Sequence, residues 1–168
     1  VFSLDKNGFK VIGLDSAKDT VSYLKKRFPN LDFRLGDITN LDLESSSMDG
    51  YWSLGVIEHF YDGYQDSLSE MKRVLKKDGY LFLSMPAMNP LRKIKAFFNL
   101  YPFFNEDEIT KNNFYQYCLD PSIVVKDFSS QGFSLVKKFY TAGLKGLKDD
   151  SPDFLKYFLQ KIYDSNHI

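Results

Sequence analysis

The sequence contains a single cysteine, Cys118, among its 168 residues. One thiol cannot form an intramolecular disulfide, and no Cys/His spacing typical of a zinc site is present. A lone cysteine is typical of a protein from a reducing compartment. We therefore predict a cytoplasmic protein without a metal site.

Long apolar runs and net charge are also lacking. No run of about 18 apolar residues occurs, so no membrane-spanning helix is expected, and no signal peptide is visible. Lys and Arg total 22, as do Asp and Glu, which makes the formal net charge zero. Overall charge therefore recruits neither nucleic acid nor an anionic membrane, and we predict no nucleic-acid partner. The sequence carries no indication of its oligomeric state.

What is present is a foldable composition with a regular alternation. Hydrophobic residues make up 43% of the chain and aromatic residues 17%, more than disordered chains contain. Short β-rich runs alternate with segments of helical periodicity. Strands are predicted at 9–14, 31–35, 51–56 and 80–85, and helices at 16–29 and 65–77. This order predicts an α/β fold with a mostly parallel sheet.

Two of these segments carry more detailed predictions. Ser16 is expected to cap the first helix. The run YLFLSM at 80–85 has no polar alternation, as expected of a strand that is covered on both faces.

Polar residues follow the predicted strands. Ligands of open α/β sheets bind beyond the carboxyl ends of the strands, so these residues are site candidates. Asp15 could accept both hydroxyls of a ribose, or it could only cap the next helix. Asp37 could accept a hydrogen bond from an adenine amine, with Ile38 packed on the ring, or it could belong to a simple turn. Glu58 and His59 follow the third run.

In order along the chain, three stretches resemble the class I S-adenosylmethionine-dependent methyltransferases: VIGLDSAKDTVSYLKKRFPNLDFRLGDITNL, MDGYWSLGVIEHF and KRVLKKDGYLFLSMP. They look most like the small-molecule group that includes the ubiquinone-type O-methyltransferases. The resemblance runs from about Phe9 to Pro86. It implies a Rossmann-like, doubly wound, mostly parallel sheet. It also implies S-adenosylmethionine as cofactor and methyl transfer to an oxygen or nitrogen of a small-molecule acceptor.

The resemblance assigns cofactor-binding roles to two groups of residues. Asp15, followed by Ser16, matches the acid that holds the ribose, and Asp37 matches the acid that meets the adenine amine, with Ile38 beside it. The methionine part of the cofactor is implied to lie against Leu54, Gly55 and Val56.

His59 matches the position that faces the methyl group and the acceptor. An imidazole there could act as general base or orient the acceptor. It could also line the pocket without proton transfer, or be structural. Glu58 is expected to orient a neighbour or bind the start of a helix rather than to transfer a proton.

One family feature is missing. The family's first strand and its acid-x-Gly-x-Gly loop are absent, and the opening VFSLDKNGFK, which lacks an initiator Met, resembles the helix that follows that loop. We expect the sequence to be part of a longer protein, with a fold that is incomplete at its N-terminus. The loss should leave two strands without their shared neighbour.

We predict one methyltransferase-like domain over residues 1–168, with a lid-like aromatic insertion at about 89–117. In that insertion Ile94, Phe97 or Phe98, and Tyr101 share a helix face near several basic residues. Three readings are open: packing on the core, an apolar lid, and, least favoured, peripheral contact with a membrane. Phe114, Tyr115 and Tyr117 could extend an aromatic acceptor pocket.

Two other functions compete with methyl transfer. A nicotinamide-dependent oxidoreductase also places an acid after its second strand to hold a ribose. A non-catalytic module that keeps the fold and binds a partner is favoured by the missing glycine-rich loop.

Overall fold

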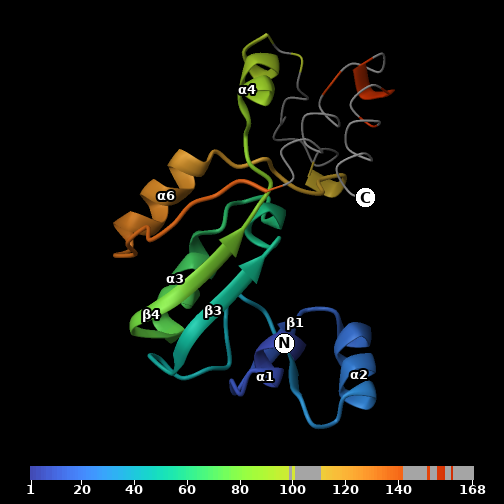
Figure 1. Ribbon diagram of the computed structural model, residues 1–168, viewed down its shortest axis with the longest axis vertical. Helices are drawn as coiled ribbons and strands as arrows, with labels where there is room; N and C mark the ends of the chain where they lie inside the picture. The colour runs from blue at the N-terminus through green and yellow to red at the C-terminus, as the bar shows by residue number, and fades with distance from the viewer. Residues whose placement is uncertain (99, 101–110, 142–150, 152–154, 158–159, 161–168) are drawn as a thin grey trace. The chain divides into compact units, whose positions relative to one another are not determined.

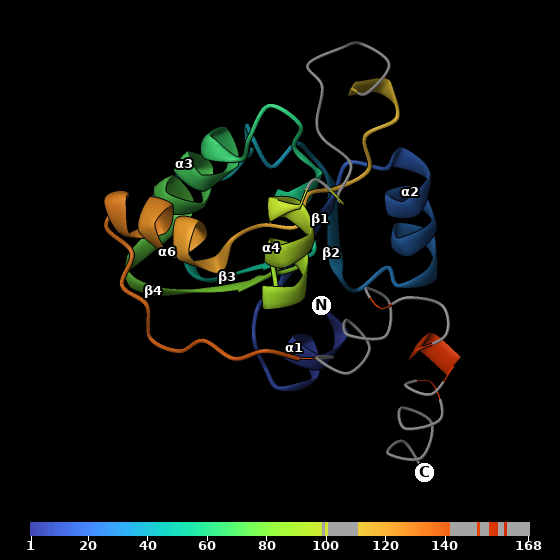
Figure 2. The same cartoon turned by 90° about the horizontal axis from the view of Figure 1, so that it is seen from above.

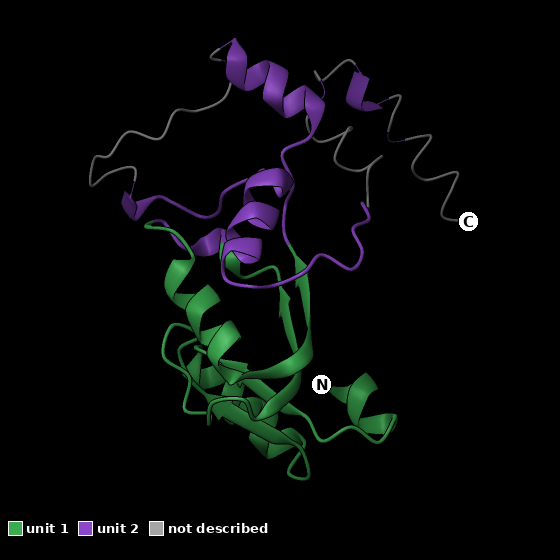
Figure 3. Cartoon of the chain, turned by 90° about the vertical axis from the view of Figure 1, so that its left-hand side faces the viewer, with its two compact units in different colours: residues 1–57, 62–84 green, residues 58–61, 85–168 purple. Residues whose placement is uncertain are grey.

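The computed structural model describes residues 1–98, 100, 111–141, 151, 155–157 and 160 (Figure 1). The chain divides into two compact units (Figure 3). The first comprises Val1–Ile57 and Asp62–Ser84, and the second comprises Glu58–Tyr61 and Met85–Ile168. Each unit is described by itself.

The first unit is an α/β arrangement. Its elements are α1 (Phe2–Lys6), β1 (Ile12–Asp15), α2 (Lys18–Arg27), β2 (Asp32–Leu35), β3 (Met48–Leu54), α3 (Gln65–Val74) and β4 (Leu75–Ser84). β1 pairs with β2 and β3 pairs with β4, both in parallel. The predicted α/β fold with parallel strands is confirmed.

The two strand pairs form separate sheets in the described part of the chain. Figure 2 shows β1 beside β2, and Figure 1 shows β3 beside β4. No ladder joins one pair to the other among the described residues. This separation agrees with the expectation that two strands lack their shared neighbour.

Close packing between β1 and β2 depends on a glycine. A Cβ atom on Gly13 would lie 2.7 Å from Cδ1 of Phe33, the buried residue of β2. α2 then begins after Ala17, whose backbone N–H is bound by the carboxylate of Asp15 at 2.8 Å. The predicted cap by Ser16 is wrong, because Ala17 is the N-cap residue and no side chain accepts a cap hydrogen bond from α2.

α3 buries one stripe of apolar residues at helical spacing. Tyr64, Leu68, Met71 and Leu75 are all buried. The helix ends at Val74 rather than near Lys77, because Leu75 pairs with Met48 and begins β4.

A bulge in β4 explains the early end of α3. The register shifts between the pairs at Met48 and Gly50, and Asp78 in the bulge has φ of 64°. Lys76 Nζ lies 2.8 Å from Oδ1 of Asp49 on the facing strand. Asp78-Gly79, a dipeptide common in turns, thus lies in a bulge within the strand.

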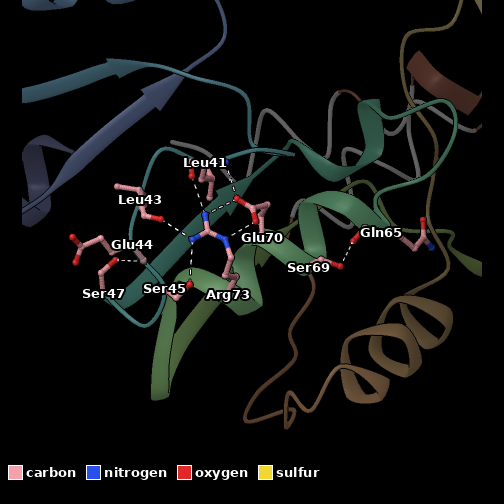
Figure 4. A network of polar contacts seen from close by, with 9 residues as sticks. All are labelled: Leu41, Leu43, Glu44, Ser45, Ser47, Gln65, Ser69, Glu70 and Arg73. Atoms are coloured by element: carbon pink, nitrogen blue, oxygen red, sulfur yellow. Dashed lines mark hydrogen bonds and ion pairs between the residues drawn. The ribbon is translucent and has the colours of Figure 1, made fainter.

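Arg73 of α3 fixes the loop that leads into β3 (Figure 4). Its guanidinium donates to both carboxylate oxygens of Glu70, at 2.6 and 2.7 Å. It also donates to the backbone carbonyls of Leu41 at 2.9 Å and Leu43 at 2.7 Å. Glu70 Oε2 in turn accepts from the N–H of Leu41 at 2.7 Å. A bidentate, charge-assisted pair therefore satisfies backbone groups that would otherwise need water.

β3 and β4 are covered on one face only. Ser53 is buried, whereas Trp52 and Phe82 are each 44% exposed and Tyr80 is 60% exposed. The rings of Trp52 and Phe82 stack with centroids 4.3 Å apart. The expectation of a strand covered on both faces is wrong for the described structure.

The second unit contains the short 3-10 turn η1 (Ile57–His59, shared with the first unit at Ile57), α4 (Pro90–Phe97) and α6 (Pro121–Ser130). Asn89 caps α4 through the N–H of Arg92, and Asp120 caps α6 through the N–H of Ser122. Lys93 Nζ pairs with Asp120 Oδ2 at 2.6 Å, which ties the two helices together.

Candidate functional site

Asp15 lies at the carboxyl end of β1 and is exposed. Its Oδ1 accepts from the N–H of Ala17, and its backbone carbonyl accepts from Gly36 N at 3.1 Å, which holds the ends of β1 and β2 together. No described residue hydrogen-bonds the second carboxylate oxygen. Asp15 thus holds the turn that leads into α2 and keeps one oxygen that no described residue occupies. Ser16 is exposed, and its side chain makes no capping bond.

Asp37 follows β2 in a tight polar turn. Its Oδ1 accepts from both the N–H and the hydroxyl of Thr39, each at 2.8 Å. These bonds lower the pKa of the Asp37 carboxyl below its usual value, so it is ionised at neutral pH. Within the described residues Oδ2 accepts no hydrogen bond and can receive a ligand donor. Ile38 beside it is half-buried.

At the carboxyl end of β3, backbone atoms and an apolar side chain are accessible to solvent. Leu54 is 59% exposed, Gly55 is exposed, and Val56 is half-buried. Gly55 has φ of 70°, a conformation that favours glycine, and its N–H bonds to the carbonyl of Ser84 at 3.0 Å. The chain therefore turns sharply here and leaves Leu54 and Gly55 accessible.

His59 in the second unit is oriented by a hydrogen bond of its Nδ1. Its Nδ1 lies 2.7 Å from the backbone carbonyl oxygen of Tyr115. A carbonyl oxygen can only accept, so Nδ1 must carry the proton. In the neutral ring, Nε2 then keeps its lone pair, and no described residue binds it. The histidine is exposed, with an uncommitted basic nitrogen.

Aromatic residues from a distant segment accompany His59. The ring centroids of Tyr61 and Phe114 are 5.3 Å apart, and those of Phe114 and Tyr117 are 4.6 Å apart. The hydroxyl of Tyr117 donates to the carbonyl of Tyr61 at 3.0 Å. The ring of Tyr115 meets that of His59 edge-on at 5.2 Å. The sequence indicated these aromatics as candidates but could not place them, because the contacts span 56 positions.

Glu58 contributes mainly its backbone. Its carbonyl accepts from the N–H of Tyr117 at 2.9 Å. The side chain is 2% exposed, and its Oε2 has no hydrogen-bond partner in the described structure. The residue therefore anchors the 114–117 segment beside His59, and its carboxylate points away from solvent. The described residues include no group of His, Cys, Asp and Glu that could hold a metal ion.

Comparison with known proteins identifies the family of the segment that contains these strands. Residues 1–83 match a family described as a methyltransferase domain. Over 77 residues the chain is 39% identical to a probable S-adenosylmethionine-dependent methyltransferase of Mycolicibacterium smegmatis, covering 46% of this chain and 30% of that protein. Residues 1–83 belong to the class I S-adenosylmethionine-dependent methyltransferases. The methyltransferase segment thus contains every predicted cofactor residue and His59.

Other relatives of the matched segment extend the comparison. A ubiquinone/menaquinone biosynthesis C-methyltransferase of Campylobacter jejuni is 37% identical over 82 residues, covering 46% of this chain and 33% of that protein. The chain thus spans about a third of the length of these curated relatives.

Solved structures of similar fold cover most of the chain. One from Methanosarcina mazei has a TM-score of 0.64 and 19% identity, and it covers 84% of this chain and 79% of that chain. Another, from Archaeoglobus fulgidus, has a TM-score of 0.59 and 15% identity, with 99% of this chain and 74% of that chain covered. At these identities the likeness establishes a Rossmann-like fold alone.

Proposed function

We propose that the protein transfers a methyl group from S-adenosylmethionine to a small-molecule acceptor, on oxygen or nitrogen. The observation that carries this proposal is the arrangement of His59, whose Nδ1 donates its proton to the Tyr115 carbonyl and whose Nε2 is bound by none of the described residues. In a chain that belongs to the methyltransferases, this leaves a base close after the strand end that is expected to meet the cofactor.

The residues of the first unit fit the cofactor. In this proposal Asp15 holds the ribose with Ser16 beside it, Asp37 accepts from the adenine amine, and Ile38 packs on the ring. Each carboxylate is exposed and has one oxygen that no described residue occupies. Leu54, Gly55 and Val56 line the methionine part. The cofactor, when bound, supplies an electrophilic methyl group.

His59 would act on the acceptor. Its Nε2 accepts the proton of an acceptor O–H or N–H as the oxygen or nitrogen becomes a nucleophile, and imidazole is suited to this at neutral pH. The hydrogen bond to the Tyr115 carbonyl keeps the imidazole ring oriented, and this lowers the part of the activation free energy that comes from aligning the base.

The aromatic residues suggest the chemical class of acceptor. Tyr115 meets the ring of His59, and Phe114 and Tyr117 pack with each other and with Tyr61, two positions after the histidine. Such rings favour an apolar or ring-bearing molecule. In this proposal residues 1–168 form one methyltransferase-like domain, and the insertion at about 89–117 contributes this acceptor side.

A carbon acceptor is a second candidate. The Campylobacter jejuni relatives are named C-methyltransferases, whereas the sequence resemblance suggested transfer to oxygen or nitrogen. An activated ring carbon also loses a proton during methylation, so the same histidine would serve. Mass and NMR analysis of the methylated product distinguishes the three kinds of bond.

Calorimetry with S-adenosylhomocysteine tests the cofactor site in the full-length protein. We expect binding, and we expect Asp37→Ala to weaken it by roughly 10-fold to 100-fold, since a hydrogen bond to a charged group contributes about 1.5–3 kcal/mol. S-inosylhomocysteine, which lacks the adenine amine, is the matched probe. Its 6-oxo group cannot donate to a carboxylate, so Asp37→Ala should not weaken its binding.

Three results would contradict parts of the proposal. No heat at high micromolar S-adenosylhomocysteine removes the methyltransferase function. Preferential binding of a nicotinamide dinucleotide favours the oxidoreductase. Binding of S-adenosylhomocysteine without turnover on any acceptor favours the non-catalytic module.

A further inference from the structure

The turn that ends α1 contains the one Asn-Gly pair of the sequence, Asn7-Gly8. Both residues are exposed, and a Cβ atom added to Gly8 would meet nothing within 4 Å. The amide side chain of an asparagine can react with the backbone nitrogen of the next residue. Glycine hinders this reaction least, because it has no side chain and a freely adjustable backbone. The pair therefore combines a reactive sequence with open surroundings.

Main-chain hydrogen bonds hold this turn closed. Gly8 has φ of 83°, and its N–H donates to the carbonyl of Asp5 at 2.9 Å. The N–H of Phe9 donates to the carbonyl of Leu4 at 3.2 Å. These two bonds form a Schellman motif, which needs the left-handed conformation that glycine supplies. The backbone nitrogen that would attack is thus engaged in the folded turn.

The side chain of Asn7 is held away from that nitrogen. Its Nδ2 donates to the carbonyl of Ser3 at 2.6 Å, one helical turn earlier. Asn7 has φ of −93° and ψ of 13°, next to the helical region, and side chains of a helix lean toward its N-terminus. The Gly8 nitrogen can therefore reach the Asn7 amide carbon only after the backbone rotates and the hydrogen bonds of the turn open.

We propose that Asn7 is a site of spontaneous deamidation whose rate is controlled by opening of the end of α1. The Gly8 nitrogen attacks Cγ of Asn7, and the new N–Cγ bond closes a succinimide ring. The bond from Cγ to Nδ2 breaks, and the proton of the attacking nitrogen leaves with the amide as ammonia. Water then adds to one of the two ring carbonyls, which gives aspartate or isoaspartate at position 7. The proposal goes beyond methyl transfer and does not depend on it.

The product cannot keep the bonds of this turn. A carboxylate has no N–H to donate to the Ser3 carbonyl, and it places negative charge at the negative end of α1. Isoaspartate also carries the main chain through the side-chain carbon, which displaces the donors of the Schellman motif. α1 packs through Phe2, whose ring meets that of Phe28 with centroids 4.5 Å apart. Deamidated protein should therefore have a lower thermal midpoint than the parent, measured by circular dichroism.

Incubation of the full-length protein at neutral pH tests the proposal. Peptide mapping by mass spectrometry follows aspartate and isoaspartate at position 7. We expect product to form about 5-fold to 30-fold more slowly in the folded protein than in the chain unfolded in guanidinium chloride, since hydrogen bonds must open first. Asn30 and Asn40 are also exposed, but each precedes a leucine, whose side chain hinders the attack. Both should stay intact and serve as internal controls.

Two variants of Ser3 change the helix without altering the reacting pair. Ser3 is exposed, and it binds Asn7 through its backbone carbonyl, which every variant keeps. Glycine lowers helix propensity and alanine raises it, so deamidation should be up to about fivefold faster in Ser3→Gly than in Ser3→Ala. The two variants should react alike in guanidinium chloride. Asn7→Gln should form no product at this position on the same timescale.

Other results would overturn the proposal. Absence of product at Asn7 in the unfolded chain would remove the site. Equal rates in the folded and unfolded protein, or in the two folded Ser3 variants, would show that the end of α1 does not control the reaction. Product at Asn30 or Asn40 as fast as at Asn7 would mean that the glycine gives no preference. A thermal midpoint unchanged by complete deamidation would contradict the role given to the turn.

Discussion

His59 illustrates how one backbone contact can set the chemistry of a side chain. The carbonyl of Tyr115 accepts from Nδ1, and this contact determines which nitrogen is left as a base. The contact uses main-chain atoms of residue 115, so the identity of that side chain does not decide the tautomer.

Substitution of His59 separates proton transfer from cofactor binding. We expect His59→Ala to lower kcat by about 10²-fold to 10⁴-fold, the usual contribution of general acid–base catalysis. S-adenosylhomocysteine affinity should change little, because the assigned cofactor residues are elsewhere. His59→Gln is the matched control for side-chain size and hydrogen bonding. Unchanged kcat in both variants would mean that His59 only lines the site.

For single residues, the sequence predicted where the site candidates lie in the fold better than it predicted which residues they contact. Asp15 and Asp37 lie at the carboxyl ends of β1 and β2, where the rule for parallel sheets places ligand-binding residues. Whether they hold a cofactor stays a prediction. The contact between His59 and Tyr115 could not be predicted, because no local pattern links residues so far apart in the chain.

Among the elements, α3 and its loop depend on one partly buried ion pair. Arg73 and Glu70 join α3 to the backbone of Leu41 and Leu43 (Figure 4). The hydrogen bond from Arg73 lowers the pKa of the Glu70 carboxyl below its usual value of 4.5, and the N–H of Leu41 adds to the effect.

The pH dependence of stability follows from this shift. A carboxyl whose pKa is lower in the folded state stabilises the fold fully above its unfolded pKa and loses that contribution as pH falls through the folded value. We therefore expect Glu70→Gln to lower the thermal midpoint at pH 7 by about 2–4 °C, the shift for about 1 kcal/mol in a chain of this size. The difference from the parent should shrink below about pH 4. A constant difference across pH would show that the charge is not responsible.

α3 also shows which features local sequence patterns can predict and which they cannot. The buried stripe of α3 follows from its spacing alone, since hydrophobic periodicity is a strong signal. The end of α3 does not follow from the sequence pattern, because Leu75 pairs its backbone with Met48 of β3 and so begins a strand. A tertiary contact therefore overrides the helix-forming Lys76 and Lys77.

For the first unit as a whole, stability rests on a small core. Met71 and Val74 are fully buried, and Ile57 is 1% exposed. With two separate strand pairs, few other side chains reach this depth, so each core residue carries a large share of the stability.

Truncation of the core should show this directly. We expect Met71→Ala to reduce the free energy of unfolding by about 2–5 kcal/mol, measured by urea denaturation. Ser69→Ala, an exposed change on the same helix, should stay within about 0.5 kcal/mol. A loss below about 1 kcal/mol at Met71 would mean that α3 contributes little to the core.

The overall α/β class was predictable because alternating strands and helices admit few arrangements. The exposed face of β3 and β4 was not predictable, since a continuous apolar run indicates a strand that is buried on both faces.

That exposed face contains the only tryptophan of the chain, Trp52, stacked on Phe82. An indole that is 44% exposed emits in a partly aqueous environment, and its emission shifts when water is removed from it. The chain thus carries an intrinsic fluorophore at the surface that a doubly wound fold would cover. Any strand, helix or partner that covers this face of the sheet will shift the emission wavelength of Trp52.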